Sequence, residues 1–380
     1  MPSMDSGVEG GVAARGHFYP AVGHAEPTAH WIVSIGLTCV VLGALVWAVP
    51  TAPMTGDGQY YIGFVRSDFQ HAASSVHERR ILGPLIVRAL PVDPLDGFHV
   101  LTIGSLALTA LLTWAAARQL VDQQRALLAI PLLLGTWVAA PNLREFGLVD
   151  PLAWVFVAAI WLAILRQRWF VAAVLGAIGV LAKEVVLLTA FAAAVAAWTA
   201  GRRVGAAIIL GLPLLVLAAL SVIFRGSGTD VVGYSTAWIR DGLGSLGPLR
   251  IVYLMFVSYA AVWLLVPFGF QQLPQPARRA AAVLLVGVVG LPLVGSPERM
   301  EEAIFPAVVA AAVLALHRWP YSLAWTLAIG NLVFVARIGG DARIPTALAW
   351  AGLLLAVSLA VMPPVLARAQ TLRGTTVPSP

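Results

Sequence analysis

Long apolar runs separated by short polar connections recur along most of this 380-residue chain. Many of the runs approach the roughly 20 residues that a helix needs to cross a bilayer. The pattern predicts an all-α polytopic membrane helix bundle of about 12 segments, of which the short ones leave room for half-crossing or re-entrant pieces. The expected segments are 31–49, 98–117, 126–141, 150–165, 169–182, 184–200, 204–223, 250–269, 280–294, 303–316, 320–336 and 345–362.

The apolar stretch 169–200 is interrupted by Lys183 and Glu184, and arginines flank it at 166–168 and 201–203. One continuous helix over these 32 residues would be about 48 Å long, whereas the bilayer core is about 30 Å thick. It would also place the two arginine clusters on opposite faces of the membrane. We therefore expect a helical hairpin with Lys183 and Glu184 at its tip, and the continuous helix is the alternative.

Composition supports a membrane protein, since 59% of the residues are hydrophobic and only 11% are charged, against roughly 45–50% and about 25% in soluble domains. The single cysteine, Cys39, excludes an internal disulfide. Segment 31–49 follows a polar leader, which indicates a retained signal anchor. We expect a disordered cytoplasmic tail at 1–29, a membrane domain at 30–366 and a second cytoplasmic tail at 367–380.

The short basic connections fall on one side of the bundle in this segment count, and basic loops favour the cytoplasm. Both termini should then be cytoplasmic in a multi-pass plasma-membrane protein. The other side holds the long loops 50–97 and 224–249, and it carries 14 acidic residues against 4 on the cytoplasmic side. This acid-rich face indicates a working surface, whereas the arginine clusters are typical of topology signals. They lie at 118–125, 166–168, 201–203, 275–279 and 317–318.

The outer loop 50–97 begins with a stretch that predicts a helix lying in the outer interface. Asp57, Tyr60, Tyr61 and Phe64 follow i, i+3, i+4, i+7 spacing, so one face carries an acid followed by aromatic rings. Asp57 is a candidate for catalysis. The alternative is that its carboxylate only caps the N-terminus of the helix.

A second amphipathic stretch in the same loop spans 79–90, with Arg79 and Arg88 at the edges of its apolar face and Arg80 pointing away from it. The Gly83-Pro84 pair can kink or restart this helix. We again expect a helix in the outer interface. The expected apolar face consists of Ile81, Leu82, Leu85, Ile86 and Ala89.

Three further groups of charged residues lie on the same predicted side: Arg144, Glu145 and Asp150 within 142–151; Lys183 with Glu184; and Arg299 among the acids of 295–306. Ionisable residues at membrane depth are functional candidates by default. The alternative for the first group is interfacial anchoring with an acidic helix start, and for the second it is a salt bridge between helices. His71 and His77 are six residues apart, a spacing too weak to predict a metal site.

Short landmarks spread over roughly residues 31–310 resemble the bacterial members of the GT-C glycosyltransferase superfamily. GDGQYY, from residue 56, resembles the acidic motif after the first membrane helix, and RRILGPLIVRAL, from residue 79, resembles the basic amphipathic segment of the same loop. DPLAWVFVAAIWLAI, LAKEVVLL and PERMEEAIFPAVVAA resemble later landmarks. The family motif is often a pair of nearby acids, whereas Asp57 has Gly58 and Gln59 beside it.

The resemblance implies a bacterial enzyme that moves a sugar from a polyprenyl-phosphate donor to a glycan, lipid or protein acceptor on the outer face. It assigns no cofactor, and a divalent metal is left open. In such a transfer a carboxylate takes the proton of the acceptor hydroxyl, for which we expect Asp57. Fixed cations stabilise the leaving phosphate. Lys183, kept charged by Glu184, is expected to hold one phosphate oxygen. The expected substrate-binding residues are Tyr60, Tyr61, Arg79, Arg80, Arg144, Glu145, Asp150, Lys183, Glu184 and Arg299.

Two other functions are compatible with the same residues. A transporter or flippase of a lipid-linked or anionic substrate would use buried charges along a central pathway, and broken helices in two related halves would favour it. No internal repeat is evident. The net charge of +6 indicates topology signals and contact with membrane lipid headgroups, not nucleic acid as a partner. A non-catalytic scaffold of an envelope-assembly complex would not need an acid and cations converging on one outer cavity.

Overall fold

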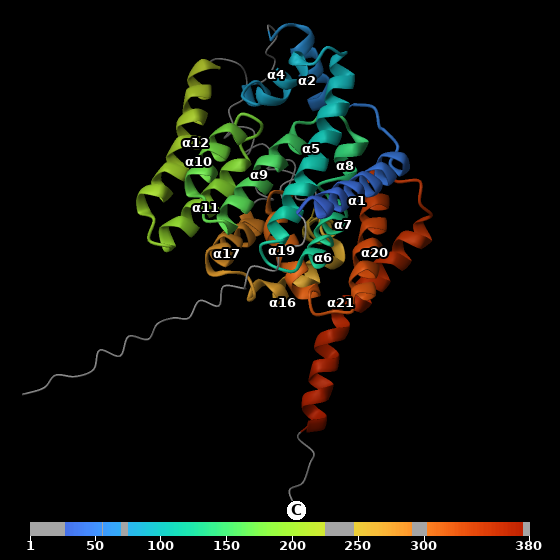
Figure 1. Ribbon diagram of the computed structural model, residues 1–380. Helices are drawn as coiled ribbons and strands as arrows, with labels where there is room; N and C mark the ends of the chain where they lie inside the picture. Colours follow the sequence, from blue (N-terminus) through green and yellow to red (C-terminus); the bar gives the residue numbers. More distant parts are fainter. Residues whose placement is uncertain (1–26, 55, 70–74, 225–246, 291–301, 375–380) are drawn as a thin grey trace, which may run out of the picture.

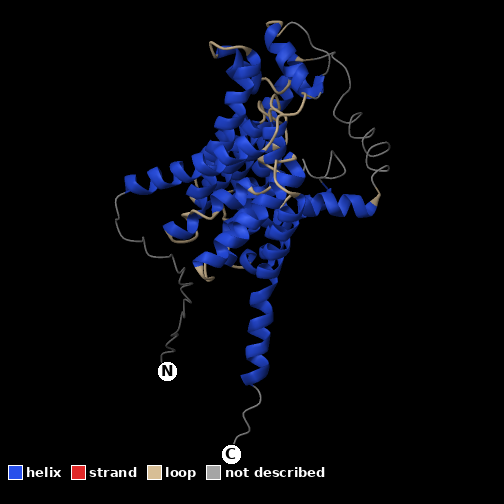
Figure 2. Cartoon of the chain, turned by 90° about the vertical axis from the view of Figure 1, so that its right-hand side faces the viewer, coloured by secondary structure: helices blue, strands red, loops and turns tan. Residues whose placement is uncertain are grey.

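The computed structural model describes residues 27–54, 56–69, 75–224, 247–290 and 302–374, and this part of the chain is helical (Figures 1 and 2). The first helices are α1 (Pro27–Ala48), α2 (Gly56–Arg66), α3 (Ser75–Glu78), α4 (Leu82–Ala89), α5 (Pro94–Ala117), α6 (Gln123–Ala126), α7 (Ala129–Leu134), α8 (Ala140–Arg144) and α9 (Asp150–Leu165). They are followed by α10 (Trp169–Gly179), α11 (Val186–Thr199), α12 (Arg203–Ile223), α15 (Pro248–Val257), η2 (Ala260–Leu265), α16 (Val266–Phe270), α17 (Gln275–Gly290), η4 (Glu302–Ile304), α19 (Phe305–Leu316), α20 (Tyr321–Gly340) and α21 (Thr346–Gly374).

Four described helices, α1, α5, α12 and α20, are each long and apolar enough to cross a membrane, and α15 with its continuation makes a fifth if one bent pair counts as one span. Several expected segments appear as shorter apolar helices, including α9, which has the bounds expected from the sequence. This is a helical membrane protein, and the count of about 12 segments stays a prediction. The expected C-terminal boundary at residue 366 falls inside α21, which continues to Gly374.

Two expected segments are broken. The stretch 126–141 divides into α7 and α8, and 250–269 bends by 85° between α15 and η2. The breaks face each other, because the Trp137 backbone N–H donates to the Ser258 carbonyl at 2.8 Å. Backbone groups freed by a break in an apolar surrounding need another partner.

Asn331 on α20, which is fully buried, supplies that partner to both breaks. Its side-chain amide donates to the Gly135 carbonyl at 2.6 Å, and its side-chain oxygen accepts from the Ala261 backbone N–H at 2.8 Å. One side chain thus joins α20 to the end of α7 and the start of η2.

The stretch 169–200 forms the expected hairpin. α10 and α12 begin side by side, since a Cβ placed on Gly205 would lie 3.7 Å from the Trp169 Cβ. Further along α10, a Cβ on Gly176 would lie 3.3 Å from the Ala190 Cβ of α11. The arginine clusters at 166–168 and 201–203 therefore lie at the same end, and the continuous helix is excluded.

The basic connections do more than signal topology, which corrects the expectation from the sequence. Arg125 Nη1 donates to the Leu316 and Trp319 carbonyls at 3.3 and 2.6 Å, where α19 ends. Arg279 Nη1 donates to the Thr199 carbonyl at the end of α11 at 2.6 Å. Cations at a helix C-terminus satisfy its last carbonyls and oppose the negative end of its dipole.

The connections assigned to the opposite side also lie together. The Ala52 backbone N–H donates to the Arg144 carbonyl at 2.8 Å, and Arg343 donates likewise to the Ala48 carbonyl. Figure 1 places α2 and α4 at one end of the molecule and α6 and α16 towards the other. These described connections group as expected, whereas 225–246 and 291–301 lie outside the described residues, and the sidedness of the whole chain stays a prediction.

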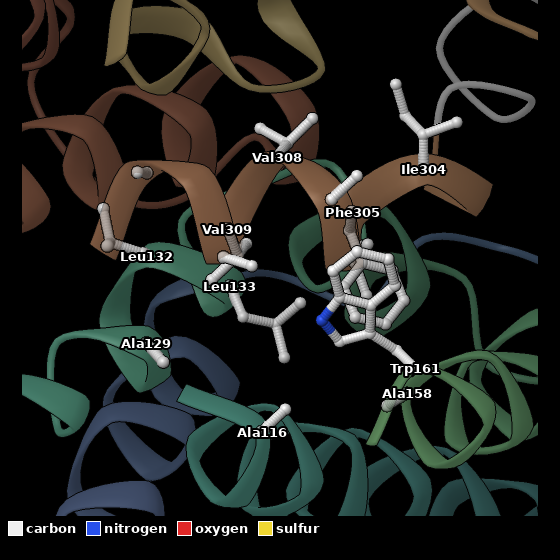
Figure 3. Packing of buried hydrophobic residues seen from close by; sticks show 14 of the residues in the cluster. Ala116, Ala129, Leu132, Leu133, Ala158, Trp161, Ile304, Phe305, Val308 and Val309 are labelled. Atoms are coloured by element: carbon white, nitrogen blue, oxygen red, sulfur yellow. The ribbon is translucent and has the colours of Figure 1, made fainter. Parts of the chain in front are cut away.

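The core between these ends packs small residues against a few large rings (Figure 3). Ala116 of α5, Trp161 of α9 and Val309 of α19 line one small interior space, and the Trp154 ring lies 6.5 Å from the Phe305 ring, centroid to centroid. All of these side chains are buried. Small residues let membrane helices approach closely and gain van der Waals contact.

The helix expected over 79–90 begins only at Leu82, with Gly83 and Pro84 in its first turn. Its packed side also differs from the expected one, because Gly83, Pro84 and Val87 are buried whereas Leu85 is 46% exposed. An apolar face turned away from the protein suits a helix that lies in a membrane interface.

The grouping of connections predicts which positions an impermeant reagent reaches. In a Cys39→Ala background, a single cysteine at Val92, in the exposed end of the 50–97 loop, should be labelled by a membrane-impermeant maleimide in intact cells. A cysteine at the exposed Gln124 should be labelled only after permeabilisation. Labelling of both positions in intact cells would contradict this topology.

Asn331→Leu should destabilise the protein strongly, because it leaves the Gly135 carbonyl and the Ala261 N–H without a partner at about 1–3 kcal/mol each. The measurement is the thermal unfolding midpoint in detergent. Thr326→Val is the matched control on α20, since it removes only an exposed hydrogen bond to Ser322. Equal midpoints for the two variants would show that Asn331 does not hold the breaks.

Candidate functional site

The loop 50–97 folds onto the segment that joins α8 to α9. Gly147, with φ of +101°, lies so close to Gly58 that a Cβ on it would be 3.0 Å from the Gly58 Cα. Glycine is required there, because the left-handed region and the near contact both disfavour a side chain. The Leu82 backbone N–H donates to the Leu181 carbonyl at 3.0 Å, so the same loop also contacts the tip of the α10–α11 hairpin.

Asp57 lies in the first turn of α2, which begins at Gly56. His77 Nε2 lies 3.0 Å from Asp57 Oδ1. The His77 ring also contacts the rings of Tyr60 and Tyr61, with centroids 4.9 and 5.5 Å apart. The Asp57 and His77 side chains are 35% and 21% exposed, so the pair is accessible from outside.

Arg80 forms a two-point contact with Glu184. Its Nη2 contacts Glu184 Oε1, and its Nε donates to Oε2 at 3.0 Å. Arg80 Nη1 also donates to the Tyr61 hydroxyl at 3.4 Å. Burial raises the pKa of the Tyr61 hydroxyl well above its usual range, against the lowering effect of Arg80. Tyr61 is therefore a neutral phenol at physiological pH and not a proton acceptor.

Lys183 contacts Asp150 Oδ1 at the start of α9 instead of Glu184, which corrects the expected partnership. Lys183 and Asp150 side chains are each only 3% exposed, whereas Glu184 is 35% exposed. The two consecutive side chains thus leave the hairpin tip in different directions. The Lys183 ammonium also lies 5.9 Å from the centre of the Trp154 ring, within reach of a cation–π interaction.

Arg79 differs from its neighbour Arg80. Its side chain is half-buried, and its Nε is buried without a hydrogen-bond partner among the described residues. The preceding Glu78 is 2% exposed. A buried guanidinium nitrogen that makes no hydrogen bond is costly, so a ligand with acceptor oxygens would satisfy it.

Arg144 and Glu145 lie apart from these pairs, on a second feature that we call the α8 cavity. Arg144 Nη1 lies 2.6 Å from Asp341 Oδ2 at the end of α20. The cavity has a volume of about 310 Å³, within the ~300–1,000 Å³ range of ligand pockets. Its lining consists of Ala52, Pro53, Trp137, Pro141, Asn142, Arg144, Glu145, Leu148, Glu302 and Gly339.

The structure therefore divides the residues expected from the sequence into two groups. One group surrounds the hairpin tip: Asp57, Tyr60, Tyr61, Arg80, Asp150, Lys183 and Glu184. The other lines the α8 cavity: Arg144 and Glu145. Arg299 and His71 lie outside the described residues, among which no three histidine, cysteine, aspartate or glutamate side chains gather as metal ligands.

Sequence reasoning considered His77 only as a metal ligand and missed its contact with Asp57. It also missed Asn142, Trp137 and Asp341. His77 is 20 residues from Asp57 in the chain, and no periodicity connects them. Glu302 belonged to a charged group that the sequence did single out, but its place beside the buried Asn142 depends on the approach of α8 and η4.

Comparison with solved structures identifies a fold likeness to ArnT from Cupriavidus metallidurans. Its crystal structure bound to undecaprenyl phosphate matches with a TM-score of 0.54 and 12% identity, covering 88% of this chain and 77% of that chain. Its apo structure matches over the same shares with a TM-score of 0.52. No family model and no curated protein sequence matches this chain. At this identity the likeness shows the fold alone, and it agrees with the fold implied by the resemblance seen in the sequence.

Proposed function

We propose that this chain is an integral membrane glycosyltransferase that moves a sugar from a polyprenyl-phosphate donor to an acceptor on the outer face. One observation carries the proposal. The short segment 77–80 brings a histidine onto Asp57 at one end and an arginine onto Glu184 at the other. Proton-accepting groups and phosphate-binding cations thus lie a few residues apart, on a fold that in ArnT accommodates undecaprenyl phosphate.

Arg79 is the side chain best suited to the donor phosphate. A guanidinium offers several donors in a planar fork that matches phosphate oxygens. Arg80 is already held by Glu184 and Tyr61, so it fixes the segment on which Arg79 stands. In the transfer, charge grows on the leaving phosphate, and a fixed cation beside it lowers the barrier.

The α8 cavity suits a sugar ring. Asn142, Arg144, Glu145 and Glu302 supply donors and acceptors for hydroxyl groups, and Trp137 supplies an apolar ring surface. Asn142 and Glu302 are each 2% exposed, so their positions are set by the surrounding protein. Segment 142–150 contributes several residues to the cavity lining and carries Asp150 at its C-terminal end.

Lys183 is proposed as a support for this site instead of the phosphate contact expected from the sequence. Its ammonium is almost fully buried and is matched by Asp150, so a phosphate would have to displace a buried partner. The pair fastens the hairpin tip to α9. Glu184, the next residue, then stands where Arg80 can reach it.

The proposed function is tested by turnover of radiolabelled polyprenyl-phosphate sugars by the purified protein in detergent. We expect transfer by the wild type and a loss of about 10²–10⁴-fold for Asp57→Asn, because the amide cannot take part in proton removal. Asp93→Asn is the matched control, since Asp93 is half-exposed in the same loop and pairs with Arg66 at 3.2 Å. Absence of transfer with pentosyl and hexosyl donors would reject the proposal.

Lys183→Met should lower the unfolding midpoint, because it removes the cation that contacts the buried Asp150 carboxylate, and breaking a buried pair typically costs about 3–5 kcal/mol. The paired change Lys183→Met with Asp150→Asn should recover most of this loss. Under the supporting role, the double variant also retains binding of undecaprenyl phosphate, measured by titration. A double variant that regains stability but fails to bind undecaprenyl phosphate would instead support a contact between Lys183 and the donor phosphate.

A further inference from the structure

We propose that His77 and Asp57 act as one proton acceptor, in which the imidazole takes the proton of the acceptor hydroxyl and the carboxylate orients and stabilises it. The inference rests on the proposed glycosyl transfer and changes the part that Asp57 plays in it. From the sequence, Asp57 itself was expected to remove the proton. In the structure an imidazole ring lies against that carboxylate.

The hydrogen bond fixes which ring nitrogen is basic. An ionised carboxylate can only accept, so the 3.0 Å contact between His77 Nε2 and Asp57 Oδ1 has the Nε2–H group as donor. A neutral imidazole with its proton on Nε2 carries its lone pair on Nδ1. Nδ1 is therefore the atom that receives a proton. The resulting imidazolium remains in contact with a negative carboxylate, as in other acid–imidazole pairs.

The surroundings hold the ring in place without enclosing it. Tyr60 and Tyr61, both on α2, contact His77 from their ring faces and edges, and the His77 side chain is 21% exposed. A ring that contacts two aromatic neighbours and is hydrogen-bonded to a carboxylate has little rotational freedom. Partial exposure leaves room for an acceptor hydroxyl. The described titratable side chains in contact with the ring include Asp57, Tyr60 and Tyr61, all on α2.

These residues account for the proton that the acceptor hydroxyl loses in the step. The acceptor O–H bond breaks and an N–H bond forms at His77 Nδ1, while the acceptor oxygen forms its bond to the anomeric carbon of the donor sugar. The bond between that carbon and the phosphate oxygen breaks, and both its electrons leave with the lipid phosphate. The leaving phosphate gains negative charge beside Arg79, and His77 later releases its proton to water.

The test uses the full-length protein and the same donor assay. His77→Gln keeps an amide N–H that can donate to Asp57 but cannot take up a proton, so transfer should fall by about 10²–10⁴-fold. Added imidazole should restore transfer by His77→Ala at least in part.

His99→Gln is the matched control, because the His99 ring lies in the same region but packs on Phe146, with centroids 4.1 Å apart. It should transfer at the wild-type rate and gain nothing from imidazole. Titration with undecaprenyl phosphate checks that each variant is folded. If His77→Gln fails to bind undecaprenyl phosphate, the response of His77→Ala to imidazole decides whether His77 is the proton acceptor.

The failures can be told apart. A wild-type protein that transfers no sugar overturns the proposed function, and the inference with it. An active wild type whose His77→Gln variant transfers at nearly the same rate, while Asp57→Asn is inactive, overturns the inference alone and leaves the carboxylate as the base. Loss of transfer in His77→Ala with no response to imidazole also overturns it.

Discussion

The structure depends on one constraint, which is that backbone groups released from a helix in an apolar surrounding must find new partners. Two helical segments end in the middle of the bundle, and Asn331 hydrogen-bonds to a backbone group from each of them. Because α7 ends at Leu134, the chain can turn and begin α8 at Ala140. The residues of α8 and the segment behind it then line a cavity and reach the hairpin tip.

A second level of organisation is the pair of ionic contacts at that tip. Buried ion pairs add little net stability, because desolvation offsets much of their attraction, but they disfavour arrangements that leave one partner alone. Lys183 pairs with Asp150, and Glu184 pairs with Arg80. The tip of the α10–α11 hairpin is therefore fixed both to α9 and to the outer loop. The segment carrying His77 and Arg79 is positioned by these contacts. The ordering of the proposed site is thus a consequence of charges that contact one another.

The sequence was sufficient for features that repeat or that follow from length. Apolar runs predicted α9 with its bounds, and the impossible length of a helix over 169–200 predicted the hairpin. The sequence was insufficient where the structure depends on contact between two distant segments. The break after Leu134 depends on Asn331, almost two hundred residues away, and adjacency wrongly paired Lys183 with Glu184. His77 carries no local signal of its contact with Asp57, which arises only once α3 lies against α2.

The arginine contacts at the helix ends account for an unusual feature of the composition, in which Lys183 is the one lysine among 24 basic residues. Arg125 bridges to carbonyls 191 and 194 residues away, Arg279 to one 80 residues away, and Arg80 to a carboxylate 104 residues away. Each guanidinium acts as a cross-link between remote parts of the chain, and Arg80 uses Nε, Nη1 and Nη2 in its contacts. A single-point ammonium serves only where one carboxylate oxygen has to be met in a closed space. These arginines and Lys183 therefore hold distant segments of the chain together, and the choice between arginine and lysine follows from the contacts that each side chain makes.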